Sequence, residues 1–327
     1  MSSIKNIAVL TSGGDSPGMN AAIRAVVRAS LYHNLSVTGV LRGYEGLIQG
    51  DFIPMEGKSV ANIIQRGGTI LKTARSKAFR TIEGRKIAHK NLLDQNIDAL
   101  IVIGGDGTFT GADIFSKEFN FPVIGLPGTI DNDLAGTDFT IGYDTAINTV
   151  VNAVDKIRDT AESHDRIFLV EVMGRDSGLI ALRSGIGVGA EAIMIPEAHM
   201  GVDDLITRIE NGRKDKASKI IIVAEGDEAG GAYVVGEALK SKFPNSDIRI
   251  SVLGHIQRGG KPSCMDRVLA SRFGVAAVEG LLMGKTDVMV GQINREIVFT
   301  PFSQAIKHID AQEITPAWLR LVEILSL

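Results

Sequence analysis

Cysteine, tryptophan and long apolar runs are scarce in this sequence of 327 residues, which has one cysteine and one tryptophan. The single cysteine, Cys264, excludes a disulfide within the chain and suits a reducing compartment. No run of about 18 apolar residues is present, so no membrane-spanning helix is expected. The opening residues MSSIKNIAVL hold too short an apolar run for a signal peptide. We therefore expect a cytoplasmic protein with no membrane partner.

An excess of basic charge is also missing, because 35 Lys and Arg are outweighed by 38 Asp and Glu to give a net charge of −3. This balance argues against a broad basic surface, so no nucleic-acid partner is expected. Hydrophobic residues make up 44% of the chain and charged residues 22%, which allows a large core. At roughly 150 residues per domain, the length predicts about two domains.

Short apolar runs rich in Val and Ile alternate with helical patterns along the chain. These runs lack polar–apolar alternation, so both faces of each strand should be buried, as in a parallel sheet. The order predicts repeated βαβ units and a doubly wound α/β fold. The expected helices include residues 21–32, 145–162 and 202–213, and the expected strands span residues 7–10, 99–104, 122–126, 167–172, 192–195, 220–224 and 250–254.

Glycine and charged residues follow nearly every expected strand. The strand exits read TSGGDSPG, GGDGT, PGTIDND, MGRDSG, AEGDE and GHIQRGG. Strand-to-helix turns need glycine, so turn chemistry alone is one explanation. It does not account for the repeated acids and arginines. Because ligands of doubly wound sheets bind beyond the carboxyl ends of the strands, we favour a shared active-site edge.

Two of these exits are suited to phosphate and metal. TSGGDSPGMNAAIR runs from a glycine-rich loop into a helix, whose N-terminus favours phosphate oxygens, although it matches neither a Walker loop nor a Rossmann fingerprint. In GGDGT, Asp106 lies between glycines and is a candidate ligand for the water shell of Mg²⁺. The alternative is that Asp106 caps the following helix.

The TIDND segment adds a candidate general base. Phosphoryl transfer to a hydroxyl needs a group that takes the hydroxyl proton, and Asp131 is suited to that role. Asp133 would then orient Asp131 or lie behind it. The alternative is an Asx-turn in which one of the two acids caps the next helix.

Basic residues at the other exits predict a pocket for a phosphorylated substrate, since guanidinium pairs bidentately with phosphate. Arg75 follows another Gly-Gly turn and would counter charge on a transferring phosphoryl group. Any single arginine is better explained as a solvated surface charge, and it is the clustering around glycines that favours a functional role. The proposed pocket residues are Arg175, Arg249, His255 and Arg258.

The motifs as a set resemble the bacterial ATP-dependent 6-phosphofructokinase family (type A). They are TSGGDSPGMNAAIR, QRGGT, IGGDGT, GLPGTIDNDLAGTD, VEVMGR, VAEG and LGHIQRGG, and the resemblance covers essentially residues 4–320. The resemblance implies transfer of the ATP γ-phosphoryl group to the 1-hydroxyl of fructose 6-phosphate, with Mg²⁺ as cofactor.

The resemblance also implies roles for individual residues. Asp131 matches the proton acceptor, Asp106 the residue that serves Mg²⁺, and Thr129, Arg75 and Gly14 further catalytic positions. The positions that match the ATP site are Gly14, Arg75, Ser76, Gly105, Asp106, Gly107 and Thr108. Those that match the sugar-phosphate site are Thr129, Ile130, Asp131, Arg166, Met173, Gly174, Arg175, Glu225, Arg249, His255, Ile256, Gln257 and Arg258.

Two doubly wound Rossmann-like domains with three α/β/α layers and mainly parallel sheets are expected from the same resemblance. A larger ATP-binding domain would comprise residues 1–141 plus 257–306, and a smaller sugar-phosphate domain residues 142–256 plus 307–327. Arg166 and Arg249 match arginines that reach into a neighbouring subunit's site, so the resemblance implies a homotetramer.

A second branch of the family uses pyrophosphate instead of ATP. That branch typically has an acid after GGD and a Lys before TID, where this sequence has Gly107 and Gly128. An acid at residue 107 would repel the α-phosphate of ATP, whereas glycine leaves room. We therefore expect ATP as the phosphoryl donor.

Allosteric control by ADP and phosphoenolpyruvate is implied less completely. An Arg-Tyr pair common among well-known members is replaced here by Gly57-Lys58, and loss of a phosphate ligand lowers affinity by roughly ten- to hundred-fold. We therefore expect a weakened or altered effector response. The positions that match the effector site are Arg24, Arg28, Arg158, Gly189, Glu191, Lys214 and Lys216.

Two other functions stay open at this point. A kinase of NAD or of a diacylglycerol would share GGDGT, and a catalytically silent nucleotide sensor would share the fold. The PGTIDND and GHIQRGG motifs argue against the first, and the presence of Asp131 argues against the second.

Overall fold

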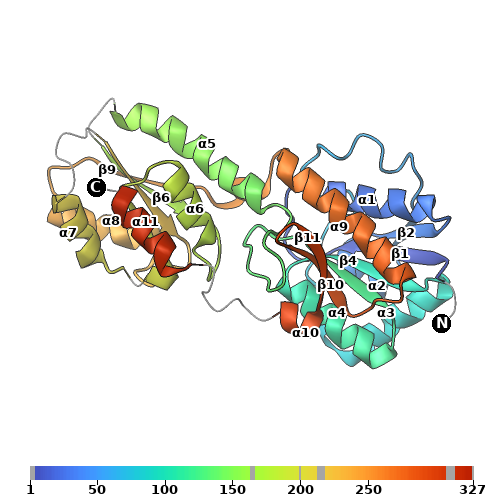
Figure 1. Ribbon diagram of the computed structural model, residues 1–327. Coiled ribbons are helices and arrows are strands. Elements are labelled where there is room, and N and C mark those ends of the chain that lie inside the picture. The colour runs from blue at the N-terminus through green and yellow to red at the C-terminus, as the bar shows by residue number, and fades with distance from the viewer. Residues whose placement is uncertain (1–3, 163–165, 199, 212–217, 307–313, 326–327) are drawn as a thin grey trace. The chain divides into compact units, whose positions relative to one another are not determined.

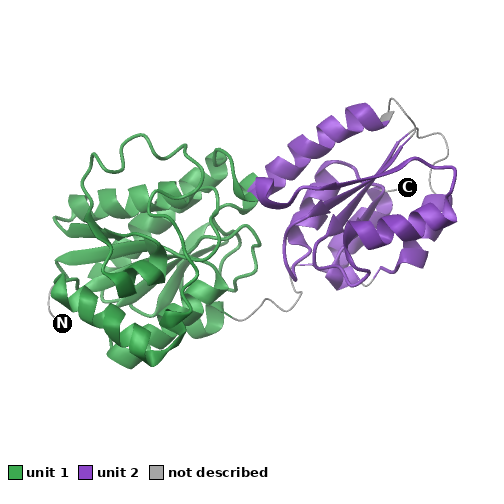
Figure 2. Ribbon diagram, turned by 180° about the vertical axis from the view of Figure 1, so that it is seen from behind, with its two compact units in different colours: residues 1–145, 258–308 green, residues 146–257, 309–327 purple. Residues whose placement is uncertain are grey.

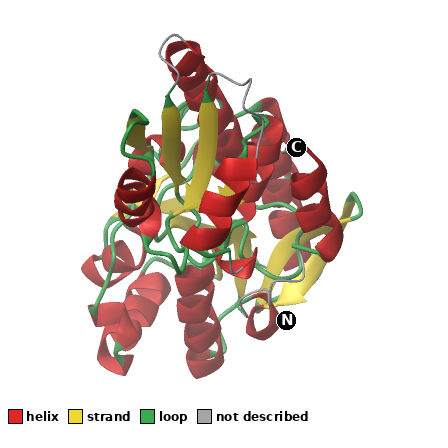
Figure 3. Cartoon of the chain, turned by 90° about the vertical axis from the view of Figure 1, so that its left-hand side faces the viewer, coloured by secondary structure: helices red, strands yellow, loops and turns green. Residues whose placement is uncertain are grey.

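The computed structural model describes residues 4–162, 166–198, 200–211, 218–306 and 314–325. Contacts between Cα atoms divide the chain into two units, shown in different colours in Figure 2. Unit 1 comprises Met1–Thr145 and Arg258–His308, and unit 2 comprises Ala146–Gln257 and Ile309–Leu327. Helices pack beside the strands in both units (Figure 3).

Unit 1 contains a seven-stranded sheet in the order β11-β10-β5-β4-β1-β2-β3. The neighbours from β10 to β2 run parallel, whereas β3 and β11 pair antiparallel at the two edges. The strands are β1 (Asn6–Thr11), β2 (Ser36–Val40), β3 (Phe52–Pro54), β4 (Ala99–Gly104), β5 (Val123–Pro127), β10 (Val288–Ile293) and β11 (Glu296–Pro301).

Both faces of this sheet are covered, which explains why its central strands are apolar throughout. Successive residues of a strand point to opposite faces. Ile7 and Val9 accordingly join one buried cluster with α1 and α9, while Ala8 and Leu10 join another with α2, α3, α4 and α10. The helices of unit 1 are α1 (Met19–Tyr32), α2 (Gly43–Gln49), η1 (Ala78–Arg80), α3 (Ile82–Asp94), α4 (Asp106–Phe119), α9 (Cys264–Leu282) and α10 (Phe302–Ala305) (Figure 1).

Helices α3 and α9 begin where hydroxyl side chains cap them. Thr81 accepts a hydrogen bond from Gly84 N, and Ser263 accepts one from Asp266 N. Such caps satisfy backbone donors that have no partner within the first turn.

Unit 2 contains a four-stranded, entirely parallel sheet in the order β7-β8-β6-β9. Its strands are β6 (Ile167–Val172), β7 (Ala192–Met194), β8 (Lys219–Ala224) and β9 (Ile248–Val252). One face of the sheet packs on α7 and α8, while α6 contacts β7 and β8. The helices are α5 (Tyr143–Glu162), which begins in unit 1, α6 (Leu179–Gly187), η2 (Pro196–Ala198), α7 (Val202–Asn211), α8 (Gly231–Lys242), η3 (Gly254–Arg258) and α11 (Pro316–Leu325).

The predicted fold class is confirmed, and each expected strand corresponds to an observed one. The predictions missed β2, β3, β10 and β11. Residues of β3 and β11 are largely half-exposed, whereas β2 and β10 are partly buried but interrupt their apolar residues with glycine and polar residues. Among the described residues, no helix has the length and apolarity needed to cross a membrane.

Candidate active site

The exits of β1, β4 and β5 lie at one edge of the sheet in unit 1. These strands are adjacent and parallel, so their carboxyl ends meet. Two backbone hydrogen bonds continue the pairing beyond the strands: Ser12 N donates to Ile103 O at 2.9 Å, and Gly128 N donates to Gly104 O at 2.9 Å. The glycine-rich segment after β1, GGDGT and TIDND are therefore brought together.

Asp106 is the first residue of α4 and is only partly buried. The N-cap is Gly105, and the helix has no side-chain cap, so the capping interpretation of Asp106 is wrong. A Cβ built on the neighbouring Gly107 meets nothing within 4 Å, which leaves open space beside this carboxylate. One carboxylate at a helix N-terminus with room for water and phosphate fits Mg²⁺, which keeps several waters when bound.

Asp131 is almost completely buried, with 1% of its surface exposed. The Thr129 hydroxyl donates to Asp131 Oδ2 at 3.3 Å and accepts from Asp131 N at 3.2 Å. The predicted catalytic acid therefore has its orientation set by another predicted site residue. Ile130 between them is also buried, whereas Asp133 is half-buried.

Asn132 is a residue of this loop for which we predicted no role. Its backbone is left-handed, with φ 53°, a conformation that Asn tolerates better than most residues. Its side chain accepts from Thr140 N at 2.7 Å and donates to Asp138 O at 3.2 Å, while Thr140 Oγ1 donates to Thr129 O at 2.7 Å. The segment 138–140 thus fixes the backbone on either side of Asp131.

Gly14 and Arg258 lie against each other in unit 1. A Cβ built on Gly14 would come within 2.5 Å of Arg258 Nη1, so a side chain here would displace the guanidinium. Arg258 Nη1 also donates to Asp15 O at 3.4 Å. Arg258 thus contacts the loop after β1, a placement that its grouping with Arg175, Arg249 and His255 did not predict.

Arg75 and Ser76 precede the short helix η1. The Arg75 side chain is exposed, and the Ser76 hydroxyl accepts a hydrogen bond from Phe79 N at 3.2 Å. In the GGDGT segment, Thr108 is buried and its carbonyl accepts a hydrogen bond from the Tyr44 hydroxyl at 2.5 Å. Burial raises the pKa of Tyr44, so the phenol stays protonated and keeps donating.

Asp266 is a buried carboxylate that the sequence did not reveal as important. It accepts from Gly142 N and Thr145 N, both at 2.8 Å, and from the Thr145 hydroxyl. Burial raises the pKa of Asp266, while these hydrogen bonds act in the opposite direction. The carboxylate fastens the first turn of α9 to the start of α5.

In unit 2, the turn Met173–Arg175 is held by two other predicted site residues. Gln257, which is fully buried, accepts from Met173 N at 2.9 Å. Glu225 Oε1 accepts from Arg175 N at 2.9 Å and from Gly174 N at 3.4 Å. Arg175 has a left-handed backbone, with φ 53°. His255 and Ile256 lie in η3 with exposed side chains.

Arg166 and Arg249 share one acidic partner in unit 2. Arg166 Nε lies 2.6 Å from Asp247 Oδ2, and Arg249 Nε lies 2.8 Å from Asp247 Oδ1. The register of β6 with β9 brings these arginines together, because Arg249 faces Phe168. The hydrogen bond from Arg166 holds the pKa of Asp247 below its usual range.

The predicted effector positions are spread over both units. Arg28 donates to Gly57 O at 3.4 Å and Arg24 is half-buried on the same helix. In unit 2, Arg158 donates to Val188 O and Glu191 accepts from Ile220 N, while Gly189 is exposed with φ 60°. Lys214 and Lys216 lie outside the described residues.

Curated relatives resemble the chain over nearly its whole length. It is 57% identical over 309 residues to ATP-dependent 6-phosphofructokinase 2 of Bacteroides thetaiotaomicron, covering 94% of this chain and 95% of the relative. It is 51% identical over 325 residues to ATP-dependent 6-phosphofructokinase 1 of Thermus thermophilus, covering 99% and 100%.

Solved structures give the same answer for the fold. Phosphofructokinase from Saccharomyces cerevisiae aligns with a TM-score of 0.87 at 37% identity, over 98% of this chain, which spans only 48% of the yeast chain. A pyrophosphate-dependent phosphofructokinase from Nitrosospira multiformis aligns with a TM-score of 0.85 at 20% identity, over 99% of this chain and 92% of that one, which shows the fold alone. The family described as Phosphofructokinase matches residues 6–281. The chain therefore belongs to the phosphofructokinase family.

Proposed function

We propose that the protein is an ATP-dependent 6-phosphofructokinase. It would transfer the γ-phosphoryl group of ATP to the 1-hydroxyl of fructose 6-phosphate, giving fructose 1,6-bisphosphate and ADP. The observation that carries this proposal is the edge of unit 1 where Asp106, at the start of α4, and the buried Asp131 follow neighbouring parallel strands. The names of relatives at 50–57% identity support the same activity.

Asp131 would be the group that takes the hydroxyl proton. Its hydrogen bond from Thr129 leaves the carboxylate acting as an acceptor, which a general base must be. Asp106 would hold Mg²⁺, which neutralises charge on the phosphates when bound. Arg75, Ser76, Gly14 and the backbone around Gly107 would bind ATP.

ATP is favoured over pyrophosphate by the surroundings of residue 107. The open space around Gly107 leaves room for a nucleotide, and no acid is present at this position to repel its α-phosphate. The neighbouring Gly128 is more enclosed, because a Cβ there would meet Ile103 at 3.0 Å. The pyrophosphate-dependent relative, by comparison, shares only 20% identity with the chain.

Unit 2 would supply the sugar-phosphate ligands. They would come from the Met173–Arg175 turn, Glu225 and His255. Arg166 and Arg249 would serve a neighbouring subunit in a homotetramer, and a second copy would release them from Asp247.

Steady-state rates with fructose 6-phosphate and ATP, GTP or pyrophosphate in turn test the proposal. We expect turnover with ATP at a kcat/KM well above that with pyrophosphate. Turnover with pyrophosphate alone would assign the other branch of the family. ATP binding without turnover would instead support a nucleotide sensor.

The same assay tests regulation. Because Gly57-Lys58 offers no guanidinium near Arg28, we expect weak inhibition by phosphoenolpyruvate and little relief by ADP. Potent inhibition that ADP reverses would show that the effector site is intact despite this change.

A further inference from the structure

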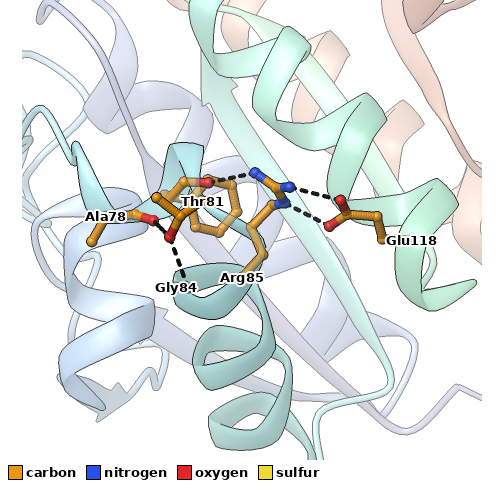
Figure 4. A network of polar contacts seen from close by, with 6 residues as sticks. Ala78, Thr81, Gly84, Arg85 and Glu118 are labelled. Carbon is orange, nitrogen blue, oxygen red and sulfur yellow. Dashed lines mark hydrogen bonds and ion pairs between the residues drawn. The ribbon is translucent and has the colours of Figure 1, made fainter.

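Helix α4, which begins at Asp106, is held on one face at four points (Figure 4 shows the far end). The points are Thr108, Gly111, Phe115 and Glu118, whose spacing places them on the same side of the helix. Asp106 and Glu118 lie about 18 Å apart along the helix axis, at roughly 1.5 Å per residue. A contact at Glu118 therefore acts on the end of α4 that is opposite to Asp106.

Arg85 makes the contact at the far end. Its Nε lies 2.5 Å from Glu118 Oε2 and its Nη2 lies 2.6 Å from Oε1, a bidentate pairing. Arg85 is only 7% exposed. The hydrogen bond from Arg85 lowers the pKa of Glu118, so the carboxylate stays charged and keeps accepting at neutral pH.

The same guanidinium also contacts η1, the short helix that follows Arg75 and Ser76. Arg85 Nη1 donates to Phe79 O at 3.0 Å, and Phe79 N donates to the Ser76 hydroxyl. Thr81, which caps α3, also donates to Ala78 O at 2.8 Å. The helix η1, and with it the segment that begins at Arg75, is therefore fastened to α3 through its carbonyl groups (Figure 4).

The aromatic rings of Phe79 and Tyr44 connect η1 to α4. Phe79 stacks on Tyr44, with ring centroids 4.0 Å apart, and the Tyr44 hydroxyl donates to Thr108 O. Both rings lie against Gly111: a Cβ there would be 3.1 Å from Tyr44 and 3.4 Å from Phe79. Phe79 also lies 5.8 Å from the ring of Phe115. The spacing between η1 and α4 is thus set by packed aromatic rings.

We propose that Arg85 is a positioning residue for the nucleotide: paired with Glu118 and bonded to Phe79 O, it fixes the Arg75–Ser76 segment relative to Asp106–Thr108. This inference rests on the proposed function, because it takes these two segments as the walls that hold ATP. Arg85 acts through Phe79 and Glu118 and carries no role in the chemical step.

The test replaces Arg85 by Met, which keeps the unbranched stem, and by Lys, which keeps the charge but loses the fork. We expect Arg85→Met to raise both the KM and the Kd for Mg-ATP about tenfold, or about 1.4 kcal/mol. Arg85→Lys should give a smaller increase, and the KM for fructose 6-phosphate should stay within about twofold. Calorimetric titration with Mg-ATP gives the Kd without turnover.

Lys117→Gln is the matched control, because Lys117 pairs with Asp113 on the same helix, Nζ to Oδ2 at 2.7 Å, but is largely exposed. It should leave the Kd for Mg-ATP unchanged. If Arg85→Met does not fold, Tyr44→Phe keeps the stacked ring, removes only the bond to Thr108 O, and should raise the Kd about threefold.

The outcomes separate the inference from the proposed function. A folded Arg85→Met protein with a wild-type Kd for Mg-ATP overturns the inference, and so does an equal rise in the KM of both substrates, which would indicate general loosening. Wild-type protein that binds Mg-ATP but does not turn over fructose 6-phosphate refutes the proposed function and leaves the inference standing if Arg85→Met still weakens binding. Wild-type protein that binds no Mg-ATP overturns both.

Discussion

The strand exits of the two units are held in place by different kinds of residue. In unit 1, the loop around Asp131 is fixed by Asn132 and Thr140, neither of which is a predicted ligand or catalytic group. In unit 2, the Met173–Arg175 turn is fixed by Glu225 and Gln257, which are themselves predicted to bind the sugar phosphate.

In unit 1, most of the residues that hold the loop are distinct from the predicted ligands, with Thr129 as an exception. In unit 2, the predicted ligands themselves hold the turn. In unit 1, a change at a reacting side chain should alter the chemistry and leave the loop in place. In unit 2, a change at one ligand should move the others as well, because it removes the acceptor for their backbone N–H groups. Substitutions in the two units should therefore have different kinetic signatures.

Asp131→Ser should give the largest effect on kcat and tests whether a reacting side chain in unit 1 can change without moving its loop. Loss of a general base should lower kcat by ~10²-fold or more. The binding of fructose 6-phosphate and the melting temperature should change little, because Asn132 and Thr140 still hold the backbone. Steady-state kinetics and thermal unfolding measure both. A folded variant with near-normal kcat would refute the assignment of Asp131.

Glu225→Gln should affect substrate binding most. The amide keeps an acceptor oxygen but loses the charge that strengthens the bonds from Gly174 N and Arg175 N, so the KM for fructose 6-phosphate should rise about tenfold. Titration with the sugar phosphate checks this. Glu228→Gln, at an exposed acid on the same loop, is the control. A change in kcat without a change in the KM for fructose 6-phosphate would contradict the difference between the two units.

Asn132→Ala tests the scaffold of unit 1 directly. It leaves Thr140 N without its acceptor and places Ala at φ 53°, so unfolding should become easier by about 1–3 kcal/mol. Denaturant unfolding measures the loss. Asn132→Gly tolerates this φ and should lose less. If both variants keep wild-type stability and kcat, the loop does not depend on Asn132.

The Arg85–Glu118 pair predicts the smallest effect, a pH dependence of stability. The hydrogen bond from Arg85 lowers the pKa of Glu118 in the folded protein. The pair therefore stabilises the folded protein at pH values above 4.5, the ordinary pKa of Glu. This stabilisation is lost as the pH falls through the lower pKa that Glu118 has in the folded protein. Glu118→Gln should be less stable than wild type at neutral pH, by about 0.5–1 kcal/mol, because solvent screens this partly exposed carboxylate. The two melting temperatures should converge in acid, whereas a constant difference would contradict the prediction.

The sequence predicted what depends on local pattern. Apolar runs that end in glycine and an acid identified β1, β4 and β5, and their parallel order brought Asp106 and Asp131 to one edge. The inner strand β2 and the edge strand β11 were not predicted, because both are partly exposed and mix polar with apolar residues.

Contacts between distant residues were beyond such patterns. Tyr44 and Thr108 lie 64 residues apart in sequence, and Asp266 lies 124 residues from Gly142. Nothing near Tyr44 or Asp266 in the sequence marks the partner that each will meet. Only Asn132 had a local signal, since Asn is favoured in left-handed turns such as TIDND adopts.

Strand β9 is an edge of the sheet in unit 2, with β6 on one side only. An unpaired edge is a template on which strands of other molecules can add and start aggregation. Two features oppose this: β9 has only five residues, and its second residue, Arg249, is charged and exposed. The Arg249 side chain, which pairs with Asp247, would thus also oppose the addition of a foreign strand at this edge.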